Sequence, residues 1–183
     1  MMEEKKGVAY ATLSYIVWGL LPIYWKLLAG IDPITILYYR IIGTALFSFF
    51  LGWWATGLTR FLDRSFFTRN RILTMLAAGL LISMNWGIYI WAVNNNQIVQ
   101  ASLGYYINPL FTYLFGILFF HEKANKRKTI ALLLSVAGVA YMVIGYGGFP
   151  VVSITLPLLF ASYGAVKKKL RFHAVHGLFF ETI

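Results

Sequence analysis

The sequence predicts an all-α membrane protein, a polytopic bundle of transmembrane helices, and three observations lead to this fold class. The chain of 183 residues is 60% hydrophobic and only 12% charged, with a mean hydropathy of +0.70. A soluble domain has about a quarter charged residues, and one this small could not bury so much apolar surface. The apolar residues form segments of about 20 residues, which cross a bilayer as helices. Basic residues separate these segments in a regular alternation.

Six apolar segments are long enough, or nearly so, to span a bilayer, and a seventh begins after them. The six predicted spans are Gly7–Leu28, Pro33–Thr56, Ile72–Val93, Val99–Phe120, Thr129–Tyr146 and Phe149–Val166. The seventh begins near Val175, and the sequence ends inside it. The first segment lacks the short apolar region and cleavage site of a signal peptide, so we expect it to be a span.

Lys and Arg predict the orientation, because they gather in cytoplasmic loops. Fourteen of the 16 basic residues lie at the N-terminus, in the loops after the second and fourth spans, and after the sixth span. The loops between these clusters contain no Lys or Arg. We therefore expect a cytoplasmic N-terminus and contact between the basic loops and anionic lipid headgroups. The same placement argues against a nucleic-acid partner.

The two remaining basic residues, Lys26 and Arg40, lie inside predicted spans, in the outer half of the membrane. Lys26 is close to the outer end of its span, where its side chain either extends to the headgroups or assists at the mouth of a solute path. Arg40 is about seven residues, or roughly 10 Å, below the outer edge. An arginine at the centre of a span costs about 2.5–3.5 kcal/mol on insertion scales, so Arg40 needs a reason to be there.

Small residues recur every four positions after Arg40, a pattern typical of a helix-packing face. They are Thr44, Ser48, Gly52 and Thr56. Because Arg40 begins this face, we expect its side chain to point into the bundle. Two roles stay open: a structural role, in which Arg40 pairs with Asp32 or a backbone carbonyl, and a functional role, in which it attracts an anionic group of a solute.

The third and fourth spans carry further polar side chains at helical spacing. A buried Asn in lipid needs hydrogen-bond partners on another helix or on a ligand. Together with Trp18 in the middle of the first span, they complete a set of candidate substrate-binding residues: Trp18, Lys26, Arg40, Asn85, Trp86, Tyr89, Tyr105 and Asn108. Asn94, Asn95 and Asn96 predict a turn. Pro22 and Pro109 interrupt hydrogen bonding within spans, either as packing kinks or as hinges of a moving bundle.

Groups for catalysis are scarce. The chain has no cysteine and no P-loop motif, and Glu181 is the one acid of six that falls in a predicted span. His173 and His176 could share a helix face, but two ligands alone make a weak metal site. We therefore expect no enzyme activity, no metal, no cofactor and no direct use of ATP.

Four stretches resemble the RarD proteins of the EamA family, in the drug/metabolite transporter superfamily. They are "YIVWGLLPIYWKLL", "YYRII", "NWGIYIWAVNN" and "ASLGYYINPLFTYLFGILFFHEK". The resemblance implies a bacterial inner-membrane carrier of ten spans, built from two five-helix inverted repeats, and a permease of the chloramphenicol-sensitivity type. Residues 7–146 would then form the first repeat and residues 149–183 the beginning of the second.

Two observations bear on this implied architecture. Tyr15–Gly19, "YIVWG", and Phe160–Gly164, "FASYG", share an aromatic-x-x-aromatic-Gly pattern. The sequence also ends early in the predicted seventh span, which favours a fragment over a half-size protein that forms a homodimer. We expect a secondary transporter of small organic metabolites or drugs that works by alternating access. The alternative is a non-transporting membrane assembly or sensor subunit.

Overall fold

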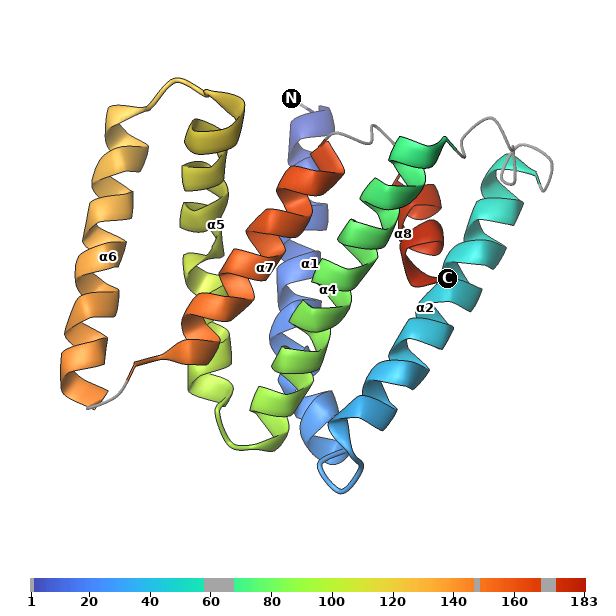
Figure 1. Cartoon of the computed structure of the whole chain (residues 1–183), viewed down its shortest axis with the longest axis horizontal. Helices are drawn as coiled ribbons and strands as arrows, with labels where there is room; N and C mark the ends of the chain where they lie inside the picture. Colours follow the sequence, from blue (N-terminus) through green and yellow to red (C-terminus); the bar gives the residue numbers. More distant parts are fainter. Residues whose placement is uncertain (1, 58–67, 147–148, 169–173) are drawn as a thin grey trace.

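The computed structural model describes residues 2–57, 68–146, 149–168 and 174–183, and every regular element in these ranges is a helix (Figure 1). The helices are α1 (Met2–Leu27), α2 (Pro33–Thr56), α4 (Arg69–Asn94), α5 (Ile98–Phe120), α6 (Lys126–Tyr146), α7 (Val151–Lys168) and α8 (Ala174–Thr182). The six predicted spans and the start of the seventh each coincide with one helix. Five basic or histidine residues on which the predictions drew lie outside the described residues: Arg60, Arg64, Lys169, Arg171 and His173.

Local sequence signals set the helix ends at one side of the bundle. Pro33 opens α2, where its missing N–H costs nothing. The Asp32 carboxylate caps this end by accepting hydrogen bonds from the backbone N–H groups of Ile34, at 3.0 Å, and Thr35, at 3.1 Å. The Asp32 side chain therefore acts as the N-cap of α2. The predicted turn after α4 is present, with Asn96 in a left-handed conformation at φ 61°.

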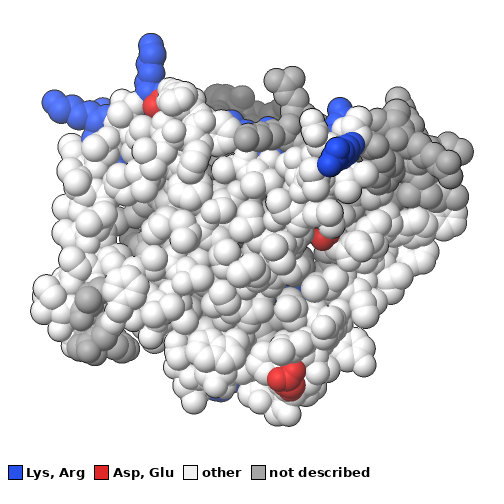
Figure 2. All heavy atoms as spheres, in the orientation of Figure 1, with Lys and Arg blue, Asp and Glu red and all other residues white. Residues whose placement is uncertain are grey.

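The helices alternate in direction, so that the N-terminus, the start of α4 and the ends of α5 and α7 lie at one end of the bundle (Figure 1). The short turns after α1 and α4 lie at the opposite end. Lys and Arg gather along the first of these two edges, while the broad middle of the face shown in Figure 2 is almost entirely uncharged. This arrangement has the charge asymmetry on which the predicted orientation rests.

The core lies where α7 crosses α4 and α5, the two most extensive helix contacts of the bundle (Figure 1). Gly104 of α5 permits the close approach, because a Cβ there would lie 3.2 Å from the Ser153 carbonyl oxygen of α7. The Ser153 hydroxyl donates a hydrogen bond of 2.8 Å to the Gln100 carbonyl of α5. Small residues and interhelical hydrogen bonds of this kind hold helices together in lipid.

The small-residue face of α2 packs mainly against α8 and α4. Ser48 and Gly52 are buried there, and Thr44 and Thr56 are half-buried. The hydroxyls of Thr44, Ser48 and Thr56 donate hydrogen bonds to carbonyls of α2 itself, so they need no partner on the neighbouring helix. An aromatic contact between Phe49 and Phe179, with ring centroids 5.5 Å apart, extends the interface to α8.

The surface is that of a membrane helical bundle. Large apolar side chains are exposed on most helices, among them Trp54 at 85% and Tyr141 at 80%. Soluble monomers rarely expose continuous apolar surface on this scale. Among the described residues, four helices are long and apolar enough to cross a bilayer: α1 from Lys6, α2, α4 and α5.

The count of six spans stays a prediction, and the two remaining helices have features that explain why. The first turn of α6 is Lys126, Arg127 and Lys128, so its apolar part is shorter than the helix. The 18 residues of α7 rise about 27 Å, slightly less than a hydrocarbon core of about 30 Å, and they end in Lys167 and Lys168.

Candidate substrate cavity

A cavity of about 690 Å³ lies among α1, α2, α4, α5 and α7, and this volume falls in the usual range of small-molecule sites. Seven of its 16 lining residues are aromatic, and the lining includes six of the eight candidate substrate-binding residues and both candidate hinge prolines. These are Trp18, Arg40, Trp86, Tyr89, Tyr105, Asn108, Pro22 and Pro109. Residues that are far apart in the sequence thus meet around one space.

Arg40 is the single charged residue of the cavity lining. Its guanidinium carbon lies 4.1 Å from the Trp86 ring centroid and 5.2 Å from that of Trp25. A cation over an aromatic face gains about 0.5–2 kcal/mol, which offsets part of the cost of placing Arg40 in a span. No ion pair of Arg40 occurs within the described ranges. The charge is therefore stabilised by rings but not neutralised.

The structural role expected for Arg40 takes a different form from the one predicted. Asp32 does not pair with Arg40, because its carboxylate caps α2. Two tryptophans from α1 and α4 hold the guanidinium instead. Arg40 also lines a second cavity of about 540 Å³ beside α1 and α2, so it borders two hollow regions.

Tyr105 is the centre of the aromatic lining. Its ring makes edge-on contacts with Trp18 at 5.6 Å, Tyr89 at 5.3 Å and Phe160 at 6.3 Å between centroids. Its hydroxyl donates a hydrogen bond of 2.9 Å to Asn85 Oδ1. One aromatic side chain thereby joins four helices around the cavity.

Asn85 differs from its expected place. It does not line the cavity but is fully buried behind it, where its Nδ2 donates a hydrogen bond of 2.8 Å to the Leu156 carbonyl of α7. The physical reason is that a buried amide needs both donor and acceptor partners, and Tyr105 and Leu156 supply them. Asn85 therefore positions Tyr105 and contributes to the cavity through it.

Lys26 also lies outside the cavity lining. Its ammonium group donates a hydrogen bond of 2.7 Å to Asn96 Oδ1, in the turn between α4 and α5. This contact ties the end of α1 to that turn. Asn108 differs from Lys26, because it lines the cavity and its Oδ1 is buried with no hydrogen-bond partner among the described residues.

Four aromatic contributors were not among the sequence-based candidates: Tyr15, Tyr106 and Phe160, which line the cavity, and Trp25, which stacks on Arg40. Two signals could have found three of them. Tyr15 and Phe160 begin the two matching "aromatic-x-x-aromatic-Gly" stretches. Trp25 follows Trp18 by seven residues, which places both on one face of a helix.

No group of three or more His, Asp or Glu side chains that could hold a metal ion occurs within the described part of the chain. The cavity lining has tyrosines and one arginine as its ionisable groups. Such a lining can stack on, hydrogen-bond and attract a solute.

The profile of the EamA-like transporter family matches residues 5–144. A protein named "Uncharacterized transporter YojE" from Bacillus subtilis is 44% identical over 98% of this chain and 61% of its own length. Proteins named RarD are 39% identical in Streptomyces exfoliatus and 33% identical in Escherichia coli, over 98% and 99% of this chain and 57% and 61% of their own lengths. The chain thus spans about three fifths of the length of these relatives. No solved structure gives a significant match.

Proposed function

The chain belongs to the EamA-like transporter family, and on this premise we propose that it is a secondary transporter of small organic solutes. The solute would bind in the cavity around Tyr105, and an anionic group of the solute would lie against Arg40. The relatives named as transporters support this function over that of a non-transporting assembly or sensor subunit. They also favour transport over an enzymatic reaction.

The observation that carries the proposal is the unneutralised charge of Arg40 in an aromatic cavity. Charges inside a membrane protein are costly and usually mark a binding site or an ion path. The two stacked indoles keep the guanidinium in place and leave its N–H groups available. A carboxylate of the solute would accept hydrogen bonds from these groups in the two-pronged geometry that arginine favours.

The rest of the lining suits the remainder of such a solute. Trp18 and Tyr105 present ring faces and edges to an apolar or aromatic group. The unpartnered Oδ1 of Asn108 would accept a hydrogen bond from a donor group of the solute. An amphipathic organic anion satisfies the contacts with Arg40 and the aromatic rings, and a donor group on it would add the contact with Asn108.

The finer features of the mechanism belong to the same proposal. Six spans, with the N-terminus and the basic loops at the cytoplasmic face of a bacterial inner membrane, agree with the charge asymmetry. The five helices α1, α2, α4, α5 and α6 would form one repeat of a ten-span inverted-repeat transporter, and α7 would open the second. Alternating access would then expose the cavity to each side in turn, with Pro22 and Pro109 at its wall as candidate hinges.

The test is solute flux into liposomes that contain the full chain, with benzoate and its neutral analogue benzamide as a matched pair of probes. Arg40→Gln keeps a polar side chain but removes the charge. We expect it to reduce benzoate uptake about tenfold or more and to change benzamide uptake much less, because a hydrogen bond to a charged group contributes about 1.5–3 kcal/mol.

Lys26→Gln is the matched control, since it removes a positive charge near the same end of the bundle but outside the cavity. It should leave both fluxes near the wild-type values. Equal loss of both probes in Arg40→Gln would contradict the binding role of Arg40. Absence of uptake for every solute tested would contradict the transporter proposal.

A further inference from the structure

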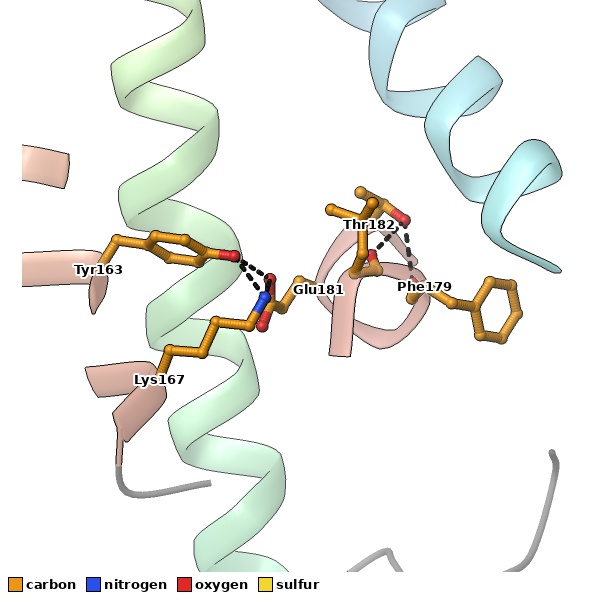
Figure 3. Close-up of polar contacts among 6 residues, drawn as sticks. Tyr163, Lys167, Phe179, Glu181 and Thr182 are labelled. Atoms are coloured by element: carbon orange, nitrogen blue, oxygen red, sulfur yellow. Dashed lines mark hydrogen bonds and ion pairs between the residues drawn. The ribbon is translucent and has the colours of Figure 1, made fainter. Parts of the chain in front are cut away.

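A second charged site lies between α7 and α8, and no role has yet been assigned to it. Tyr163 and Lys167 of α7 both point toward Glu181 of α8, beside α4 (Figure 3). The Tyr163 hydroxyl donates a hydrogen bond of 2.8 Å to Glu181 Oε2. The Lys167 ammonium donates to the Tyr163 hydroxyl at 2.6 Å and to Glu181 Oε2 at 3.2 Å. The three groups form a closed triangle on one carboxylate oxygen.

The other carboxylate oxygen, Oε1, is buried and has no hydrogen-bond partner among the described residues. Glu181 as a whole is only 8% exposed. The backbone of α8 approaches α4 so closely here that a Cβ at Gly79 would lie 2.5 Å from the Glu181 carbonyl oxygen. A buried acceptor without a partner is costly for an ionised carboxylate, and a proton on Oε1 would remove the negative charge that raises this cost.

The chain also contains an ion pair of the same type that lacks these properties. Glu122 and Lys168 form a 2.6 Å ion pair, but their side chains are 51% and 53% exposed. In the Lys167–Glu181 pair the corresponding values are 27% for the lysine and 0% for the glutamate. Water solvates both members of the first pair, whereas the carboxylate of the second depends on its protein partners.

Of the two helices joined by this buried pair, α7 lines the substrate cavity and α8 packs against a helix that does. Phe160 of α7 lines the cavity and contacts Tyr163, with ring centroids 6.1 Å apart. α8 packs against α2, the helix that carries Arg40. A change in the charge of Glu181 can therefore act on the cavity from two sides.

We propose that Glu181 is a proton-binding site and that its protonation is coupled to solute binding in the cavity. The proton would come from cytoplasmic water and add to Oε1, which makes the carboxyl group neutral. Lys167 would keep its positive charge and its hydrogen bond to Tyr163 but lose its anionic partner. The ion pair that joins α7 to α8 would then be lost, and the contact between these helices would weaken. The coupling to solute binding rests on the transport function proposed above.

Within the described ranges, few ionisable groups lie on the helices that pack around Glu181. From α7 they are Tyr163 and Lys167. Between Arg71 and Tyr89 α4 has no ionisable residue, and α2 has none after Arg40. On α8 itself the nearest is His176, five residues earlier. A pH effect on this site therefore has to be separated from titration of Lys167, Tyr163, Arg71 and His176.

The direct test is infrared difference spectroscopy of the full chain in lipid nanodiscs during a pH titration. A carboxyl group that takes up a proton gains a C=O stretching band. We expect one such band to appear during the titration, its loss in Glu181→Gln, and its retention in the matched variant Glu122→Gln. Tyr163→Phe keeps the carboxyl group but removes one hydrogen bond, so the same band should shift in frequency. The Tyr163→Phe variant keeps the test decisive if Glu181→Gln does not fold.

Identical carboxyl spectra for the wild type and Glu181→Gln would overturn the proton site, whether or not the chain transports any solute. The coupling is tested by benzoate binding, followed by tryptophan fluorescence at pH values where benzoate is ionised. Acidification should tighten binding by roughly fivefold or more in the wild type, within the usual range of coupling between sites. The change should disappear in Glu181→Gln. Binding with no pH dependence in the wild type would overturn the coupling, and absence of binding at every pH would count against the cavity function alone.

Discussion

The two sides of the cavity are built differently. On one side, α4, α5 and α7 are joined by directed contacts: Asn85 bonds to Tyr105 and to the Leu156 carbonyl, and Ser153 bonds to α5. On the other side is α1, whose Thr12 and Ser14 hydroxyls bond to carbonyls of α1 itself. α1 meets the cavity mainly through aromatic contacts such as that of Trp18, and its hydrogen bond from Lys26 to Asn96 lies at the end of the helix, outside the cavity.

This difference separates a fixed frame from a wall that can shift. Hydrogen bonds between helices have one productive geometry, so the frame of α4, α5 and α7 has a defined register. Edge-on aromatic contacts tolerate sliding and rotation more easily, because no donor has to stay aligned with an acceptor. A transporter needs both parts, since one bundle moves against another around the site.

The largest difference in stability and binding should come from two glycine-to-leucine substitutions, one in each region. Gly104→Leu puts a side chain where a Cβ already lies 3.2 Å from the Ser153 carbonyl oxygen, so we expect a loss of 3 kcal/mol or more of stability, at about the upper end of overpacking effects. Gly19→Leu has open space around its Cβ and faces the cavity. It should keep or slightly raise stability, by up to about 1 kcal/mol from helix propensity, and abolish benzoate binding.

Thermal unfolding in nanodiscs and benzoate binding measure the two outcomes on the same samples. A stable Gly104→Leu protein would show that α7 is not held against α5. Unaltered benzoate binding in Gly19→Leu would show that the solute does not occupy the space beside α1.

A smaller effect is expected from the buried amide. Asn85→Leu keeps the volume but removes two hydrogen bonds and leaves the Tyr105 hydroxyl and the Leu156 carbonyl without partners. Interhelical hydrogen bonds in membranes average about 0.6 kcal/mol and reach about 1.7 kcal/mol, so we expect a loss of about 1–3 kcal/mol. Thr12→Val on α1 is the control and should change stability by less than about 0.5 kcal/mol. Equal unfolding temperatures for the two variants would remove the distinction between frame and wall.

The sequence correctly predicts an all-helical membrane bundle, because in lipid the dominant signals are segment length, hydropathy and the placement of Lys and Arg. The turn after α4 was also predicted, from the run of asparagines. The Asp32 cap of α2 was not predicted, because Asp32 was considered only as a partner of Arg40. Arg40 could be singled out because a charge stands out in an apolar span. These signals require no knowledge of how a helix is rotated in the bundle.

The cavity was predicted less completely, because its lining depends on that rotation. An aromatic residue in an apolar helix packs equally well against lipid or protein. The sequence therefore does not show whether Trp25 and Phe160 face lipid or the interior of the bundle. The amide of Asn85 was rightly expected to need partners, but its direction was not predictable. It faces α5 and α7 at the back of the cavity, and Tyr105 alone extends from it toward the solute space.

The smallest effect concerns the exposed pair of Glu122 and Lys168. The hydrogen bond from Lys168 and its positive charge lower the pKa of the Glu122 carboxyl group. A carboxyl group with a lowered pKa in the folded state contributes stability at neutral pH, and this contribution is lost as the pH falls through the folded-state value. Because the pair is half exposed, water and salt screen it, and the contribution should be small.

Unfolding of the wild type and Glu122→Gln at neutral and acidic pH, in low and high salt, measures this contribution. The wild type should be slightly more stable only at neutral pH and low salt, and the two curves should coincide in acid or in high salt. A difference that persists in high salt would mean that the exposed pair behaves like the buried one. Exposure would then fail to explain why Glu181, but not Glu122, is suited to bind a proton coupled to the cavity.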